Sequence, residues 1–92
     1  MPQMKNSPTA TKHFKQLEAE AAKGNVDAVN TLAICLYHGK IRISETRIYD
    51  LPVNYARAAA LFQQAAEAGN MQALHNIAYC YYKGYGVERD AG

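Results

Sequence analysis

One stretch of this sequence occurs twice, as AKGNVDAVNTLAICLYHGK at residues 22–40 and as EAGNMQALHNIAYCYYKGY at residues 67–85. In one ungapped register, at an offset of 45, the copies share two glycines, two alanines, an asparagine, a cysteine and a tyrosine. An eighth position exchanges Leu32 for Ile77 and stays apolar. Because self-similarity at a fixed period is the sequence signature of repeat architectures, we expect a chain built from repeated structural units.

The repeat unit is shorter than the offset between the two copies. The segment LPVN at residues 51–54 corresponds to VERD at residues 87–90, at an offset of 36. The offsets 45 and 36 differ by nine residues, which is the length of an insertion in the first copy, within KIRISETRIYD at residues 40–50. A unit of 36 residues is typical of solenoids built from helix pairs.

Each copy predicts one helix, at residues 26–38 in the first and at residues 71–83 in the second. An asparagine directly precedes each helix, where its side-chain oxygen can accept a hydrogen bond from a free backbone N–H group. A glycine directly follows each helix, at the position where the backbone turns left-handed. These signals set the boundaries of both helices.

A second type of helix is predicted at residues 54–68, as NYARAAALFQQAAEA, and it ends at a glycine. At the same offset of 45, TATKHFKQLEAEAAKG at residues 9–24 aligns with it, and Ser7 and Pro8 give this segment a helix start. We call the helices at residues 26–38 and 71–83 helix A, and the second type helix B. The predicted order is therefore B, A, B, A, which is four helices from two phase-shifted repeats.

The second copy also matches a known pattern, A-x-x-x-L-G-x-x-Y-x-x-G-x-G-V. The matching residues are Ala73, Ile77, Ala78, Tyr81, Gly84, Gly86 and Val87. The chain thereby resembles the Sel1-like repeat, a relative of the tetratricopeptide repeat. The resemblance implies an all-α solenoid, an α-α superhelix of TPR-like helix pairs. We expect a single domain over residues 1–92. It consists of a preceding helix B at 9–24, a first repeat at 25–69 with an insertion at 41–50, and a second repeat at 70–92 that is incomplete at its C-terminus.

The resemblance also divides the helix A residues into core and groove. Leu36 and Tyr81 hold a core position of the family, so we expect both to be buried. In related helix-pair repeats the A helices line a concave groove, and the same mapping assigns eight residues to partner binding. These are Asn30, Ile34, Tyr37, His38, His75, Tyr79, Tyr82 and Lys83. Tyrosines suit recognition of a peptide or protein, because they bury a large area and keep a polar tip.

The insertion has a local pattern of its own, in which apolar and polar residues alternate as in a strand. Its candidate partner-binding residues are Ile41, Arg42, Ile43, Arg47, Ile48 and Tyr49. Two interpretations remain open: an exposed edge that pairs with a partner strand, or isoleucines that tuck against the helices. Deletion of residues 42–50 restores the family spacing, so the fold is expected to survive it.

Metal binding and catalysis are not expected. Cys35 and His38 have C-x-x-H spacing, but zinc needs three or four converging ligands. The mapping that the resemblance implies puts the cysteines in the core and the histidines in the groove. A disulfide between Cys35 and Cys80 is not expected either, because equivalent helices of adjacent repeats lie about 10 Å apart. The sequence contains no nucleophile elbow, no glycine-rich phosphate loop and no H-E-x-x-H motif. We therefore predict no enzyme, no metal and no cofactor.

Composition excludes further classes. A net charge of +2 gives no strong attraction to nucleic acid or to an anionic membrane. No apolar run approaches the roughly 20 residues of a membrane span, and the first residues lack the apolar middle of a signal peptide. The expected location is the cytoplasm.

The sequence thus predicts a protein-interaction module, an adaptor that binds a partner protein or peptide. The alternative is an inhibitor or immunity-type protein that blocks a partner enzyme through the same surface. The resemblance implies bacterial contexts, among them effectors, signalling and immunity. Asp90 begins what would be another helix B, so the last helix A is left uncapped and we expect self-association or an end-on protein contact there.

Overall fold

Residues 2–86, the part of the chain that the computed structural model describes, form four α-helices and one small hairpin. The helices are α1 (Pro8–Ala22), α2 (Val26–His38), α3 (Tyr55–Glu67) and α4 (Met71–Lys83). A 3-10 helix, η1 (Met4–Asn6), precedes α1, and strands β1 (Lys40–Arg42) and β2 (Ile48–Asp50) lie between α2 and α3. The predicted all-α repeat fold is therefore confirmed.

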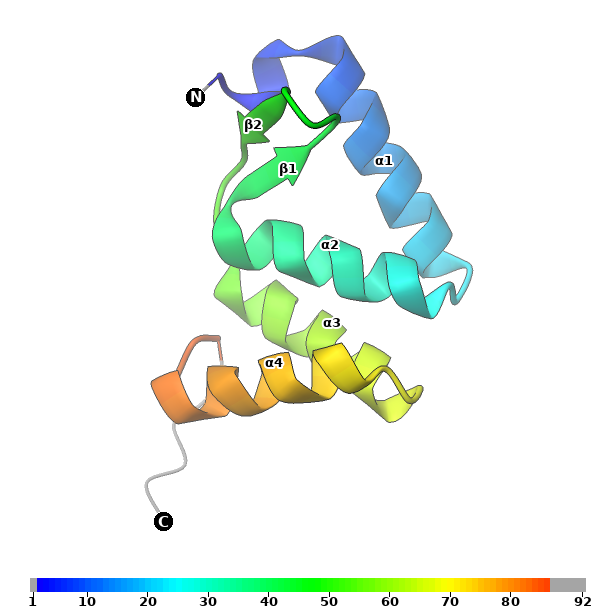
Figure 1. Ribbon diagram of the computed structural model, residues 1–92, viewed down its shortest axis with the longest axis vertical. Helices are drawn as coiled ribbons and strands as arrows, with labels where there is room; N and C mark the ends of the chain where they lie inside the picture. The colour runs from blue at the N-terminus through cyan, green and yellow to red at the C-terminus, as the bar shows by residue number, and fades with distance from the viewer. Residues whose placement is uncertain (1, 87–92) are drawn as a thin grey trace.

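The helices lie in chain order, so that each one contacts its neighbours in the sequence. Helix α2 packs between α1 and α3, and α3 packs between α2 and α4. The direction of the chain reverses from α2 to α3 and again from α3 to α4 (Figure 1). This arrangement places the two A helices, α2 and α4, on either side of α3.

Side-chain caps explain where the helices begin. The side-chain oxygens of Asn25, Asn54 and Asn70 each accept a hydrogen bond from the backbone N–H three residues later, at 3.2, 3.0 and 2.8 Å. Ser7 caps α1 in the same way, and Pro8 occupies its first turn. The two A helices have the boundaries that the sequence predicts, because caps and closing glycines are local signals.

Gly39 closes α2 at a point where the chain is crowded. Its φ is +70°, and a Cβ atom there would lie 2.6 Å from Val53 Cγ2 and 3.0 Å from the carbonyl oxygen of Leu51. Gly24, at the end of α1, also has a positive φ of +92°, but a Cβ atom there would have nothing within 4 Å. A comparison of the two glycines therefore distinguishes the cost of a left-handed backbone from the cost of a steric clash.

Gly39→Ala is expected to destabilise the fold more than Gly24→Ala. Both substitutions force alanine into the left-handed region, at about 1–2 kcal/mol, and only Gly39→Ala adds a clash, worth at least about 1 kcal/mol more. Urea unfolding followed by circular dichroism measures the difference. Equal losses of stability in the two variants would show that the hairpin end of α2 is not crowded.

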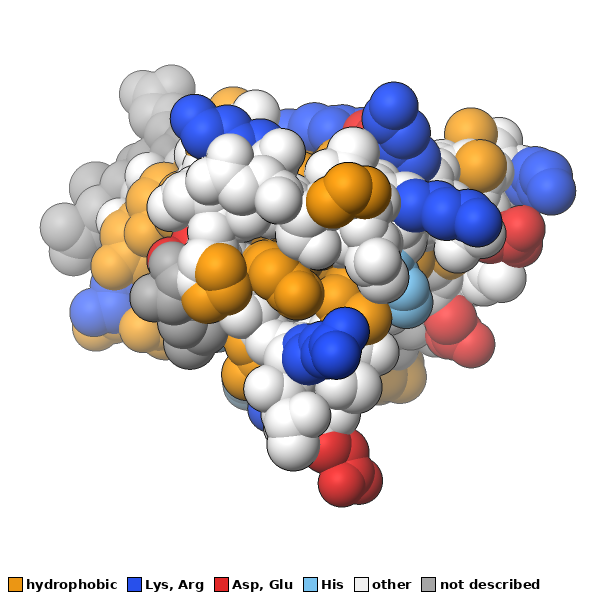
Figure 2. Space-filling view, turned by 90° about the horizontal axis from the view of Figure 1, so that it is seen from above, with side chains coloured by type: hydrophobic (Ala, Val, Ile, Leu, Met, Phe, Trp, Pro, Cys, Tyr) orange, Lys and Arg blue, Asp and Glu red, His pale blue; other side chains and the backbone are white. Residues whose placement is uncertain are grey.

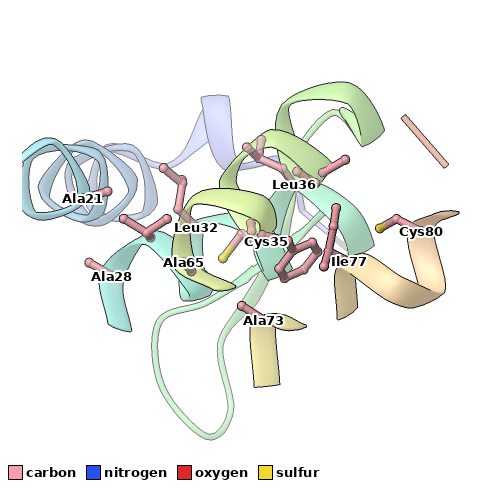
Figure 3. Close-up of a cluster of buried hydrophobic side chains, with 14 of the residues drawn as sticks. Ala21, Ala28, Leu32, Cys35, Leu36, Ala65, Ala73, Ile77 and Cys80 are labelled. Carbon is pink, nitrogen blue, oxygen red and sulfur yellow. The ribbon is translucent and has the colours of Figure 1, made fainter. Parts of the chain in front are cut away.

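The core runs through the whole stack. Figure 3 shows side chains from α1 to α4 converging on one cluster, with Ala21, Leu32, Ala65 and Ile77 among them. Phe62, only 2% exposed, is the largest of the fully buried side chains. The alanines of α3 allow its neighbours to approach closely, so this helix forms the centre of the stack.

Tyr81 is not part of this core, contrary to the expectation from the sequence. Its side chain is 43% exposed, whereas Leu36, its counterpart in α2, is 5% exposed. The difference follows from neighbours, because α3 follows and covers α2, while the described residues contain no helix after α4.

The insertion forms an antiparallel hairpin of two strands, which confirms the strand-like pattern of its sequence. Ile41 pairs with Tyr49, and Lys40 pairs with Asp50. Ile41 is 1% exposed and belongs to the hydrophobic core. The hairpin is therefore anchored to the helices through β1, as one of the two open interpretations proposed.

The N-terminal segment covers part of the other strand. The backbone N–H of Asp50 donates to the carbonyl oxygen of Pro2 at 2.7 Å, and Gln3 forms a parallel bridge with Asp50. Lys40 Nζ lies 2.9 Å from Asp50 Oδ1, and this hydrogen bond lowers the pKa of the Asp50 carboxyl. These contacts fix the outer strand of the hairpin beside the N-terminal segment (Figure 1).

Candidate partner-binding groove

A cavity of about 320 Å³ opens between the two A helices. Its lining comes from α2, α3 and α4, and consists of Ile34, Tyr37, His38, Phe62, Asn76 and Tyr79. Four of these residues were assigned to the groove from the sequence, and the structure places them around one hollow. Phe62 closes the hollow toward the core, since it is almost fully buried.

A second cavity, of about 370 Å³, continues the same surface toward the hairpin. It is lined by Thr31, Ile34, Cys35, His38, Lys40, Arg42 and Ile48. Ile34 and His38 line both cavities, so the two hollows adjoin along one side of α2. We call the residues of both cavities the inner groove.

An aromatic cluster supports one wall of the inner groove. The ring centroid of Tyr37 lies 5.5 Å from that of Tyr55, 5.8 Å from that of Tyr85 and 6.2 Å from that of Phe62. Tyr55 and Tyr85 stack at 4.7 Å with an angle of 12° between their planes. Such contacts hold Tyr37 from α3 and from the turn after α4, so its position does not depend on α2 alone.

Desolvation raises the pKa of the Tyr37 phenol above its ordinary value, and the nearby Tyr79 and Cys80 add to the effect. The phenol therefore stays neutral at physiological pH and keeps its hydroxyl proton, so it can donate a hydrogen bond.

Tyr79 lines the first cavity, whereas three other predicted residues of α4, His75, Tyr82 and Lys83, line neither cavity and lie on the exposed surface of the helix. Tyr79 and Tyr82 are 45% and 66% exposed, with ring centroids 6.5 Å apart. Lys83 Nζ lies 5.9 Å from the centroid of Tyr79 and 5.4 Å from that of Tyr82. His75 is exposed on the same helix. The ammonium group thus forms cation–π contacts with both rings, which remain largely exposed.

Asn30 does not face the groove freely, contrary to the expectation from the sequence. It is 5% exposed, and its Nδ2 donates a hydrogen bond of 2.6 Å to Gln72 Oε1. Its Oδ1 is buried and has no hydrogen-bond partner among the described residues. Asn30 thus ties α2 to α4 instead of presenting its amide at the surface.

The six insertion residues fall into two groups. Arg42 and Ile48 line the second cavity, and Arg47 is exposed at the tip of the hairpin. The others face inward: Ile41 is in the core, and Ile43 and Tyr49 pack against it while half-buried. Ile41 cannot contact a partner, because β1 anchors the hairpin through this side chain.

The sequence missed several groove residues. Phe62 comes from helix B, whereas the mapping took groove residues from the A helices alone, and Asn76 stands beside the predicted His75. Tyr55 and Tyr85 lie just outside the pattern positions, in the first turn of α3 and after the closing glycine of α4. The sequence does offer one signal near Tyr85, which is the glycine that follows it. Gly86 passes so close to α3 that a Cβ atom there would overlap the Tyr55 carbonyl.

The cysteines are free and buried, and burial raises the pKa of both thiols. Within residues 2–86, no three His, Cys, Asp or Glu side chains come together as a metal site would require. Among the same residues, every helix is too short or too polar to cross a bilayer.

The end of the molecule that carries η1 and the hairpin shows Lys and Arg side chains spread among apolar ones (Figure 2).

Comparison with known proteins places the fold in a family. The family model described as "Sel1 repeat" matches residues 26–70 and 72–92. The chain belongs to the Sel1 repeat family. A curated relative is the ERAD-associated E3 ubiquitin-protein ligase component HRD3 of Candida glabrata, 49% identical over 43 residues. That match covers 47% of this chain and 5% of the relative, so the chain spans a small part of its length. No solved structure gives a significant match.

The family and this relative indicate a protein–protein interaction module. Two features of the structure are consistent with such a role. The A helices of both repeats line one hollow, and an aromatic side chain at its edge, Tyr79, is exposed.

Proposed function

We propose that this Sel1 repeat chain is an adaptor that binds an extended segment of a partner protein in the inner groove. The observation that carries the proposal is the cavity of about 320 Å³ that α2, α3 and α4 line together. A hollow with apolar and aromatic walls and a few convergent polar groups is the usual form of a binding site.

The lining suggests the chemistry of the bound segment. Ile34 and Phe62 offer an apolar floor for one large side chain, since dispersion and desolvation favour its burial there. The Tyr37 hydroxyl and the Asn76 amide can form hydrogen bonds with the backbone of an extended peptide. We therefore expect a segment that places one apolar side chain between backbone groups that remain available for hydrogen bonds.

Contacts on both sides of the groove hold its walls in place before anything binds. Tyr37 is held by three rings, and the hydrogen bond from Asn30 to Gln72 joins the two A helices at 2.6 Å. A preformed site loses little side-chain freedom on binding, which improves affinity at a given contact area.

The double variant Tyr79→Ala, Tyr82→Ala is expected to lose binding of its peptide ligands while remaining folded. Ligands are selected from a displayed peptide library on the wild-type protein, and their affinities are then measured by calorimetry. Loss of two exposed aromatic side chains at an interface weakens binding by about 2–4 kcal/mol, which is roughly 30- to 1,000-fold.

Tyr81→Ala is the matched control, because Tyr81 lies on the same helix with a comparable exposure of 43% but lines a separate hollow between α3 and α4, whereas Tyr82 contacts the groove residue Tyr79. Its ligand affinity should stay within about twofold of wild type. Equal affinities for wild type and the double variant, with unchanged helical circular dichroism, would reject the inner groove as the binding site.

A further inference from the structure

The second cavity of the inner groove is built partly by the insertion. Its volume is about 370 Å³, and Lys40, Arg42 and Ile48 of the hairpin line it together with residues of α2. These three residues lie on one face of the hairpin, because Lys40 and Arg42 alternate with Ile41 along β1 and Ile48 pairs with Arg42. The insertion is not part of the 36-residue repeat unit, so this wall is particular to the chain.

The hairpin takes the place beside α2 that, one repeat later, α2 takes beside α4. On α4, Asn76 and Tyr79 line the first cavity from the side that faces α2. At the repeat offset of 45 they correspond to Thr31 and Ile34, which line the second cavity with the hairpin. In Figure 1 the hairpin and α4 lie on opposite sides of α2. Both walls of the second cavity are therefore formed by residues 2–86.

The lining of the second cavity is apolar toward the core and polar toward solvent. Its apolar side chains are buried or half-buried, and they are Ile34, Cys35 and Ile48. Its polar side chains are exposed, and they are Thr31, His38, Lys40 and Arg42. A side chain that enters this cavity can bury its methylene groups and keep a polar end at the opening.

Arg42 carries a positive charge at this opening that no acidic neighbour offsets. Lys40 lies 2.9 Å from Asp50 Oδ1, so its charge is already paired. Within residues 2–86, no acidic side chain forms an ion pair with the Arg42 guanidinium, and the lining contains no Asp or Glu. A guanidinium stays protonated, and its planar fork can donate two parallel hydrogen bonds to one carboxylate. A carboxylate therefore complements this opening in charge and in geometry.

We propose that Arg42 selects an acidic residue, Asp or Glu, in the partner segment that the inner groove binds. The inference rests on the proposed function and adds a second side chain to the expected ligand, next to the apolar one in the first cavity. Ile34 and His38 line both cavities, so one extended segment can reach the two hollows. Arg42 is thus a specificity-determining residue supplied by the insertion.

The probe is a library of random peptides whose C-termini are fused to the carrier protein, so that a bound carboxylate must come from a side chain. Peptides selected on the wild-type protein should carry Asp or Glu at a fixed spacing from a large apolar residue. Selection on Arg42→Gln should retain the apolar residue and lose the acidic one. Arg47→Gln is the matched control, because Arg47 is exposed at the tip of the same hairpin and lines neither cavity. It should select the same acidic peptides as the wild type.

Affinities of a selected peptide, synthesised with an amidated C-terminus, test the pairing itself. Exchange of its Asp or Glu for the corresponding amide should weaken binding to the wild type about five- to tenfold. The same exchange should change the affinity for Arg42→Gln by less than about twofold, because the pair is already broken in that variant. The comparison on the wild type needs no protein variant, so it holds whatever Arg42→Gln does to the fold.

The outcomes separate this inference from the proposed function. Three results would overturn the inference alone, if the selected peptides still lose affinity for the Tyr79→Ala, Tyr82→Ala protein. They are selected peptides without an acidic preference, equal affinities of the acidic and amide peptides for the wild type, and an acidic preference that Arg47→Gln also removes. A library that yields no ligand for the wild-type protein would overturn the inference and the proposed function together.

Discussion

Phe62→Ala is expected to lower the free energy of unfolding by about 3–5 kcal/mol. Phe62 is 2% exposed, lies at the centre of the stack on α3, and forms the floor of the cavity between α2 and α4. Truncation removes its buried apolar area and enlarges that cavity, so both the transfer term and the cavity term oppose folding. Urea unfolding followed by circular dichroism gives the free energy directly.

The other phenylalanine of the chain provides the control. Phe14 is half-buried on α1, at the end of the stack. Phe14→Ala should therefore cost clearly less, about 1–2 kcal/mol, because less apolar area is removed from the core. A domain of this size is stabilised by only about 5–15 kcal/mol, so the difference between the variants is easily measured. A loss in Phe62→Ala no greater than in Phe14→Ala would mean that α3 is not the centre of the core.

Ile41→Ala is expected to lower the free energy of unfolding by about 2–5 kcal/mol. The reason is that Ile41 is 1% exposed and joins the hairpin to the helical core, although it belongs to the insertion. The loss should also release the hairpin, so hydrogen exchange at the amides of β1 and β2 should accelerate more than at those of α3.

Ile48→Ala tests the same hairpin at a half-buried position on β2. Its expected cost is smaller, about 0.5–1.5 kcal/mol, because the side chain is already partly in water. A loss in Ile41→Ala no greater than in Ile48→Ala would mean that β1 does not anchor the hairpin to the helical core.

Much of the fold could be predicted from the sequence, because its decisive signals are local. Asparagine caps and closing glycines mark both A helices, and the offset of 45 carries that information from one repeat to the other. The alternation in the insertion likewise predicted strand geometry. For these features, the residues that determine the structure lie within a few positions of it.

The errors concern neighbours that are distant in the sequence. Helical periodicity gives the face on which Asn30 lies, but not the partner Gln72, which comes from the other repeat 42 residues later. Tyr81 occupies a core position of the pattern, yet a core position is buried only when another helix covers it. Tyr55 and Tyr85 meet across two helices, and no periodicity within one helix indicates that contact.

The claim on which the proposed function depends is that α2 and α4 share one wall. Nuclear Overhauser effects in the 92-residue protein test it most directly, through the side-chain amide of Asn30 and the side chain of Gln72, together with the rings of Tyr37 and Tyr85. We predict cross-peaks for both pairs, because the first is hydrogen-bonded at 2.6 Å and the ring centroids of the second are 5.8 Å apart. Assigned spectra without either cross-peak would show that the two A helices do not form a common surface.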